Sequence, residues 1–138
     1  MGRRFPHLLK EDIELWEQFL DSPHNIYDRY DYDIQVGDGR DPGQDFPEHI
    51  RDMALNISRR RIDAVGFQPN AITIIEISVS AGLTQLGQLQ AYPCLYKITY
   101  SPKLPLKRLL VAQSIQTDIE PVLLDQKIAY LVLPLHEP

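Results

Sequence analysis

RRRIDAVGF (residues 59–67) and AITIIEISVS (residues 71–80) are two stretches that favour β-structure, separated only by QPN at 68–70. Such runs, joined by a short turn-forming segment, predict the two antiparallel strands of a β-hairpin. Side chains two positions apart on a strand share a face, so Glu76 lies on the face of two isoleucines in the second strand. A carboxylate among apolar neighbours is costly to bury unless a partner satisfies it. Glu76 is therefore the first candidate functional residue.

A second acid lies in the first strand of the same hairpin. A tight hairpin places Asp63 beside Glu76, and two adjacent carboxylates repel each other unless a cation lies between them. Oxygen ligands with room for water suit Mg²⁺ or Mn²⁺, which activate water and neutralise charge on a phosphoryl group. The alternative is a structural ion pair, because alternation sends Arg59 and Arg61 to the face of Asp63, where an arginine would neutralise the acids without any metal.

The segments before the hairpin predict a helix and a further strand. Residues 9–20 form an amphipathic helix whose apolar face is expected to hold Leu9, Ile13, Trp16 and Leu20. Residues 30–36 alternate between apolar and polar side chains, as expected for a half-buried strand. Residues 37–47 are rich in Gly, Asp and Pro and read as a loop, and residues 48–57 form a short helix or an irregular turn.

The segments after the hairpin predict two helices and two strands. A helix begins near Gly82 and is kinked at Pro93, since proline cannot donate to the carbonyl four residues back. Its apolar side is expected to carry Leu83, Leu86 and Leu89, and its other side Gln85, Gln88 and Tyr92. Then follow a strand at 109–112, a short helix at 117–124 capped by Thr117 or Asp118, and a strand at 128–133. The order is αβββαβαβ.

Composition limits the class of protein. The chain has 138 residues, 14 basic and 19 acidic side chains, a net charge of −5 and one cysteine, Cys94. This length suits one domain with its own core, and a single cysteine forms neither an intramolecular disulfide nor a cysteine zinc cluster, so a cytoplasmic location is expected. The apolar stretch in the start MGRRFPHLL is too short for the hydrophobic region of a signal peptide, and no run of apolar residues is long enough to span a bilayer. The acidity argues against a protein whose main role is to coat nucleic acid.

Three motifs in this order carry a family resemblance. Asp63, then Glu76, Ile77 and Ser78 one strand later, then Gln88 and Tyr92 on the next helix, resemble the PD-(D/E)XK nuclease superfamily, and particularly its RecB-type branch with the Q-x-x-x-Y motif. The resemblance covers about residues 8–134. It implies an α/β fold with a restriction-endonuclease-like αβββαβ core, in which helices flank a mixed central sheet. A C-terminal helix and strand follow, within a single domain spanning 1–138.

The resemblance also implies roles for these residues. Asp63 and Glu76 would be metal ligands, assisted by the backbone carbonyl of Ile77. Gln88 and Tyr92 would line the same cleft and steady the metal-bound water or the DNA backbone. The family often adds a glutamate from the first helix, and the candidates here are Glu11, Glu14 and Glu17.

Ser78 departs from the family pattern. The family's third motif ends in a lysine, which orients the attacking water and stabilises charge on the phosphate. A serine hydroxyl with an ordinary pKa replaces the ammonium in neither role. A lysine from elsewhere in the chain could take over, and the candidates are Lys97, Lys103 and Lys107, each of which is otherwise an ordinary surface charge.

Two functions are consistent with this pattern. In the first, catalysis has degenerated and the domain is a nucleic-acid-associated or assembly module, by analogy a component of a phage virion at the head–tail junction or neck. In the second, it is an active Mg²⁺- or Mn²⁺-dependent nuclease that hydrolyses DNA phosphodiesters. Ser78, the acidity and the lack of an evident basic channel favour the first, which needs no cofactor. We expect weak Mn²⁺ binding and slow or no cleavage of DNA.

The partners and location follow from these two functions. DNA is the expected partner of a nuclease, and other proteins or a second copy of the chain are the expected partners of an assembly module, with the proline-rich edge at 101–105 packing against a partner subunit. No membrane association is expected. The location is the cytoplasm of a host cell or a virion.

Overall fold

The computed structural model describes residues 8–134; the segment 1–7, on which the signal-peptide argument rests, lies outside the described residues, as does 135–138. Its centre is one mixed five-stranded sheet in the order β1-β2-β3-β4-β5. The strands are β1 (Arg29–Val36), β2 (Arg60–Gln68), β3 (Ala71–Ala81), β4 (Leu106–Ile115) and β5 (Ala129–Val132). Strands β1, β2 and β3 pair antiparallel, whereas β4 pairs parallel with both β3 and β5. The predicted α/β class, mixed sheet and hairpin are confirmed.

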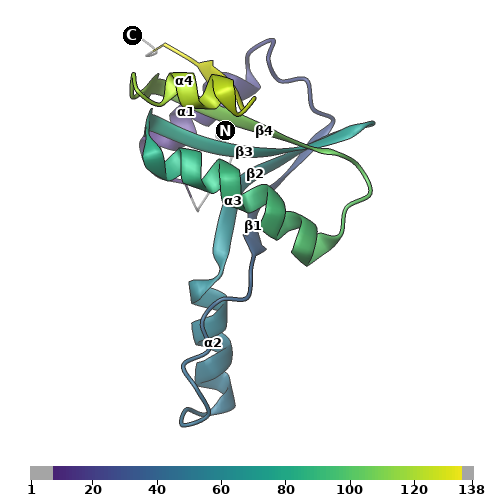
Figure 1. Ribbon diagram of the computed structural model, residues 1–138, viewed down its shortest axis with the longest axis vertical. Helices are drawn as coiled ribbons and strands as arrows, with labels where there is room; N and C mark the ends of the chain where they lie inside the picture. The colour runs from purple at the N-terminus through teal and green to yellow at the C-terminus, as the bar shows by residue number, and fades with distance from the viewer. Residues whose placement is uncertain (1–7, 135–138) are drawn as a thin grey trace.

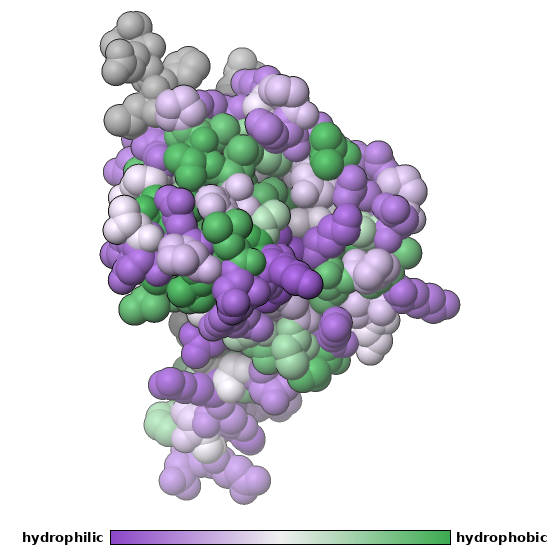
Figure 2. All heavy atoms as spheres, turned by 45° about the horizontal axis from the view of Figure 1, so that its top comes forward, coloured by the Kyte–Doolittle hydropathy of each residue, from purple (hydrophilic) through white to green (hydrophobic). Residues whose placement is uncertain are grey.

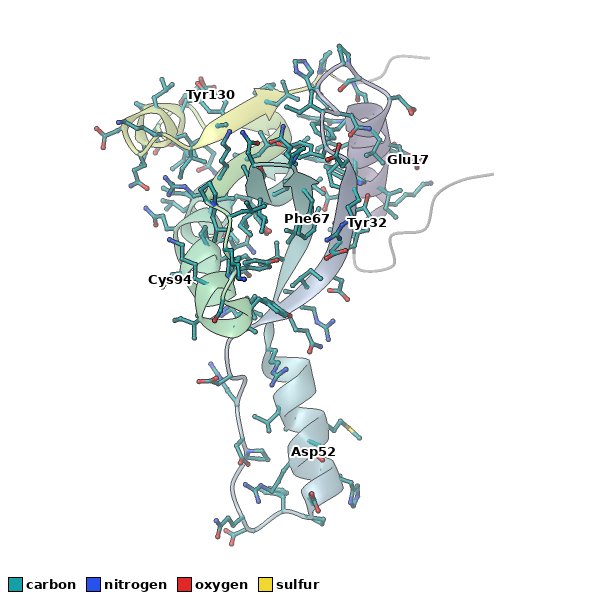
Figure 3. The ribbon with its side chains drawn as sticks, turned by 90° about the vertical axis from the view of Figure 1, so that its right-hand side faces the viewer. Glu17, Tyr32, Asp52, Phe67, Cys94 and Tyr130 are labelled. Atoms are coloured by element: carbon teal, nitrogen blue, oxygen red, sulfur yellow. The ribbon has the colours of Figure 1, made fainter. Side chains whose placement is uncertain are left out.

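Two helices cover opposite faces of the sheet (Figures 1 and 3). Helix α1 (Lys10–Leu20) packs on one face over a cluster that includes Ile75 and Ile77 of β3. Helix α3 (Leu83–Tyr100) packs on the other face over a cluster that includes Ile72 and Ile74. Alternate residues of β3 therefore face alternate helices, as its period of two predicts.

The buried face of α1 agrees in part with the predicted one, since Trp16 is buried and Ile13 and Leu20 pack partly buried against the same cluster. The buried side chains are Leu15, Trp16 and Phe19, while Leu9 is 69% exposed. The stacked Trp16 and Phe19 rings, with centroids 4.8 Å apart, fill the space between the helix and the sheet. Compared with the predicted face, the buried face of α1 is rotated toward its bulkiest side chains. In this orientation Asp12 lies on the side of the helix that faces the sheet.

The buried face of α3 also agrees only in part with the predicted one, since Leu86 and Leu89 are buried as expected. Its buried residues include Leu89, Tyr92 and Tyr96, whereas Leu83 is 71% exposed. Tyr92 therefore belongs to the core-facing side, not to the polar side to which the sequence pattern assigned it. The helix continues past Pro93 to Tyr100.

The segment 48–57, predicted as a helix or a turn, is helix α2 (Glu48–Ser58). Together with the loop before it, α2 extends away from the sheet as an arm between β1 and β2, with mostly hydrophilic side chains (Figures 1 and 2). Helix α4 (Glu120–Asp125) begins after Ile119 without a side-chain cap, so the predicted cap at Thr117 or Asp118 is wrong. Pro121 lies in its first turn, where a missing N–H costs little. None of the helices within residues 8–134 has the length and apolar content needed to cross a bilayer.

Candidate functional site

Regular pairing between β2 and β3 ends beside two carboxylates. The register runs from Gln68 opposite Ala71 to Ala64 opposite Ile75. At the next position the Asp63 backbone N–H donates to Glu76 Oε2 at 3.1 Å, and the Ile77 N–H donates to Asp63 Oδ2 at 2.9 Å. Side-chain oxygens thus take the place of backbone carbonyls as acceptors. The structure brings Asp63 and Glu76 together, as the hairpin predicted.

A change of face in β2 explains the position of Asp63. Ala64 packs in the cluster beneath α1 and Ile62 in the cluster beneath α3, although residues two apart on a regular strand share a face. The opposing strand β1 changes face at Asp33, whose φ is +54°, so the register between the strands is kept. Asp63 lies at this switch and can therefore reach across to β3 rather than into either core.

Burial dominates the electrostatics of the pair. Glu76 is 1% exposed, and burial together with the charge of Asp63 raises its pKa well above the ordinary value, while the Asp63 N–H lowers it. Burial raises the pKa of Asp63 to about 7; the Ile77 N–H lowers it, and the charges of Asp12 and Asp33 raise it further. Near neutral pH the pair therefore favours either a bound proton or a bound cation, because both remove the repulsion.

Asp12 is the acid from helix α1 that lies at this site, in place of the glutamates expected there. Its Oδ1 accepts a hydrogen bond from the Val79 N–H at 3.1 Å, and its charge contributes to the raised pKa of Asp63. Of the predicted glutamates, Glu11 and Glu14 are exposed and Glu17 is partly buried. The signal was present in the spacing, since Asp12 precedes the buried Leu15, Trp16 and Phe19 by three, four and seven residues.

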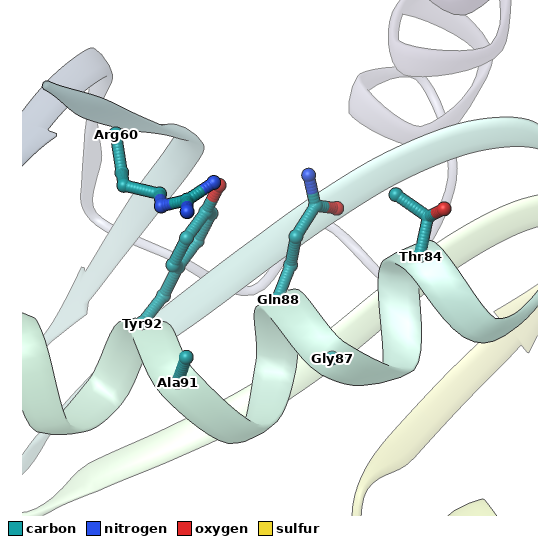
Figure 4. A pocket seen from close by; sticks show the side chains of 6 residues that line it. All are labelled: Arg60, Thr84, Gly87, Gln88, Ala91 and Tyr92. Carbon is teal, nitrogen blue, oxygen red and sulfur yellow. The ribbon is translucent and has the colours of Figure 1, made fainter. Parts of the chain in front are cut away.

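A pocket of about 340 Å³ lies between the start of β2 and helix α3 (Figure 4). Its lining residues are Arg60, Thr84, Gly87, Gln88, Ala91 and Tyr92. Burial raises the pKa of Tyr92, as do the charges of Glu76 and Asp63, whereas a hydrogen bond with Gln88 and the charge of Arg60 lower it. Tyr92 therefore lies within electrostatic reach of the carboxylate pair, and it lines the pocket together with Gln88.

The arginine at the pocket is Arg60, the one that regular alternation assigned to the face opposite Asp63. Arg61 forms an ion pair with Asp33, with Nη1 2.8 Å from Oδ2, and Arg60 lines the pocket. The prediction that Arg59 and Arg61 share the face of Asp63 assumed unbroken alternation along β2. The change of face at Asp63 reverses the faces of the residues before it. Arg60 therefore shares a face with Ile62 and lies on the side of the sheet that α3 covers.

Neither Ser78 nor any of the three lysines lines the described pocket. The Ser78 hydroxyl donates to the Ser80 carbonyl at 3.0 Å, along its own strand. Lys97, Lys103 and Lys107 are exposed. Lys107 pairs with Thr73 on β3, while Glu76 lies opposite Leu110, further along the strand. The described contacts therefore support surface positions for these lysines rather than a displaced catalytic base.

The donor set suits a hard divalent cation. Within residues 8–134, no three His, Cys, Asp or Glu side chains are grouped closely enough to hold a metal by themselves. Two adjacent, largely buried carboxylates nevertheless gain from a cation that removes their repulsion, and carboxylate, carbonyl and water oxygens are the ligands that Mg²⁺ and Mn²⁺ prefer. The carboxylates of Asp63 and Glu76 therefore suit such an ion by their chemistry.

Comparisons with known proteins reveal the fold but no close relative. No protein-family model matches the sequence, and no curated protein matches it significantly. Among solved structures, a repair endonuclease from Pyrococcus abyssi aligns with 96% of this chain at 15% identity and a TM-score of 0.52. The EndoMS protein in a complex with double-stranded DNA aligns with 99% of it at 13% identity and a TM-score of 0.52. The aligned regions are 50% and 51% of those chains, so this chain spans about half their length.

At these identities the likeness concerns the fold alone. The fold of this chain is restriction-endonuclease-like, with a mixed sheet flanked by helices, and it is shared with a structure described as a repair endonuclease.

Proposed function

We propose that this restriction-endonuclease-like domain binds double-stranded DNA and a divalent cation, and that it hydrolyses phosphodiesters slowly because position 78 lacks a cationic side chain. The observation that carries the proposal is the contact between Asp63 and Glu76 beside the pocket lined by Gln88 and Tyr92. A structural neighbour bound to double-stranded DNA supports DNA as the ligand. The assignment to the RecB-type branch with Q-x-x-x-Y belongs to the same proposal, supported by the position of Gln88 and Tyr92 on α3.

Each residue has a defined part in this mechanism. Asp63, Glu76 and the Ile77 carbonyl would hold Mg²⁺ or Mn²⁺, and such an ion supplies an activated water and neutralises charge on the phosphoryl group. Gln88 and Tyr92 direct an amide and a hydroxyl toward the DNA backbone. Ser78 cannot take a proton from water near pH 7 and adds no positive charge, so the step that a lysine would assist is slow.

Plasmid cleavage in the presence of Mn²⁺ tests this function. We expect the purified protein to nick supercoiled plasmid slowly, and Asp63→Ala to abolish the nicking while leaving DNA binding measurable. Rapid cutting that Asp63→Ala abolishes would support a fully active nuclease instead. Nicking that survives the substitution would contradict the assignment of the site.

A second candidate function, self-assembly, is favoured by two complementary surfaces. The arm at 37–58 carries five acidic side chains against two arginines and exposes Phe46 and Met53. The end of α3 and the start of β4 carry Lys97, Lys103 and Lys107 beside exposed Ile98 and Leu104. Opposite charges around apolar side chains suit the docking of the arm of one copy onto the α3 end of another.

Light scattering at low and high salt tests this assembly. A dimer or larger oligomer that dissociates in high salt would support it, and Met53→Asp should weaken that oligomer. A place in a phage head–tail junction would be one form of such an assembly. A strict monomer across concentrations would contradict self-assembly.

A further inference from the structure

We propose that the pocket between β2 and α3 is a binding site for a backbone phosphate of nucleic acid and that Arg60 is its anchor. This inference rests on the proposed function, since it places a phosphate next to the carboxylate pair. It assigns to this chain a cationic group that comes from β2, three residues before Asp63, instead of from position 78 on β3.

The arrangement of donors fits a phosphate. Arg60 of β2 and Tyr92 of α3 line the same pocket, and the side chains of Gln88 and Thr84 project from successive turns of α3 toward one side (Figure 4). A guanidinium presents several N–H donors in a plane that matches two phosphate oxygens, and amide and hydroxyl groups donate to the remaining ones.

The shape of the pocket fits the same ligand. A Cβ added at Gly87 would meet no atom within 4 Å, so this part of the helix surface is open. Ala91, one turn further along, adds only a methyl group. A small-residue surface with hydroxyl, amide and guanidinium groups around it favours a compact anion over a large apolar ligand, whose pockets are lined mostly by hydrophobic side chains.

Arg60 differs from the arginines that form ion pairs nearby. Arg29, Arg51 and Arg61 are engaged with Asp31, Asp41 and Asp33. Arg60 instead lines the pocket, where its positive charge acts on Tyr92. The acidic side chains near the site repel an anionic ligand, so such a ligand needs a positive charge close by. Arg60 provides this charge at the pocket, and a divalent cation would provide it at Asp63 and Glu76.

Fluorescence anisotropy of a labelled DNA duplex tests the assignment. Titrations in Ca²⁺, over a series of salt concentrations, compare wild-type protein with Arg60→Gln, Arg60→Lys and the neighbouring control Arg59→Gln. Arg60 is exposed, so these variants should fold, and thermal melting verifies it. We expect Arg60→Gln to weaken binding about tenfold and to reduce the slope of log K against log salt by about one, as for the loss of one phosphate contact.

The controls separate this inference from the function on which it rests. We expect Arg60→Lys to keep the salt slope with a smaller loss of affinity, and Arg59→Gln to stay within about twofold of wild type. Wild-type binding that Arg60→Gln leaves unchanged in affinity and slope would overturn the phosphate pocket alone. A folded wild-type protein that does not bind duplex DNA would overturn both the pocket and the proposed function.

Discussion

Asp63 and Glu76 are joined through the backbone of the sheet as well as through their charges. Glu76 Oε2 accepts the N–H of Asp63, and Asp63 Oδ2 accepts the N–H of Ile77, the residue that follows Glu76. These hydrogen bonds fix the orientation of both carboxylates before any ligand binds. A preorganised pair pays little entropy when it binds a cation, but it costs stability whenever both groups are charged without one.

Metal-free protein should lose stability as the pH rises from about 4 to about 7. The pKa of folded Asp63 is raised to about 7, so the folded state binds more protons than the unfolded state in this window, and the free energy of unfolding falls with increasing pH. Glu76, Asp12 and Asp33 face Asp63, and Arg61 partly neutralises Asp33. Asp63→Asn keeps an oxygen for the Ile77 N–H but removes the charge.

Urea unfolding in EDTA at pH 5 and pH 8 measures this effect. We expect the unfolding free energy of Asp63→Asn, relative to that of wild type, to be higher at pH 8 than at pH 5, by an amount on the order of 2 kcal/mol. Parallel pH profiles for the two proteins would show that Asp63 has an ordinary pKa and would contradict the buried pair.

Ser78→Lys should increase DNA cleavage. Ser78 is only partly buried and lies two residues after Glu76 on β3, so a longer side chain at this position would project from the face that carries Glu76. A lysine that orients water and stabilises phosphoryl charge contributes at least about tenfold to the rate. The measurement is the plasmid nicking rate in Mn²⁺, with the exposed Ser80→Lys as the matched control for added charge. Equal rates for the two variants would mean that the serine does not limit catalysis.

The fold was largely predictable from the sequence because its strands are strongly patterned. Two neighbouring β-type runs joined by a short turn predicted the β2–β3 hairpin, and the pairing of Gln68 with Ala71 confirms it with a turn of two residues, Pro69 and Asn70. The faces of α1 and α3 were predictable only in part, because each helix has more apolar side chains than its buried face holds and packing selects among them. Trp16 and Phe19 determine the orientation of α1 through their size.

Of the candidate site, the sequence predicted the central pair of carboxylates but not all of the residues around it. Asp63 and Glu76 lie together because of the hairpin, which is local in sequence. Asp12 and Arg60 reach the site through a rotation of α1 and a change of face in β2, and neither follows from regular periodicity. The positive φ of Asp33 that accompanies this change is a tertiary feature of the β1–β2 pair.

Asp12→Asn should weaken Mn²⁺ binding without unfolding the protein. An asparagine keeps an oxygen for the Val79 N–H, so α1 stays attached to β3. The lost charge reduces the attraction for a cation at Asp63, and changes to groups that surround metal ligands typically cost about 10-fold in affinity. Calorimetric titration measures the affinity, with the exposed Glu11→Gln as control. An equal loss in the control would point to a general charge effect.

Gly66→Ala should destabilise the protein, and Gly87→Ala should stabilise it. A Cβ at Gly66 would lie 2.7 Å from the Tyr27 ring, so the ring must move or the strand must shift, at a cost of about 1–3 kcal/mol. A Cβ at Gly87 meets no neighbour, and alanine favours a helix over glycine by about 1 kcal/mol. Thermal or urea unfolding of the two variants measures the sign of the change in stability for each. A neutral Gly66→Ala would show that Tyr27 does not pack against β2.

Electron paramagnetic resonance of added Mn²⁺ tests the carboxylate pair most directly, because it counts bound ions whether or not DNA is cut. The comparison is wild-type protein against Glu76→Gln, which retains an oxygen for the Asp63 N–H, and against the exposed control Glu14→Gln. We predict one weakly bound Mn²⁺ per wild-type chain and per Glu14→Gln chain, and its loss in Glu76→Gln. Mn²⁺ binding that is the same in all three proteins would contradict the assignment of the cation to Asp63 and Glu76.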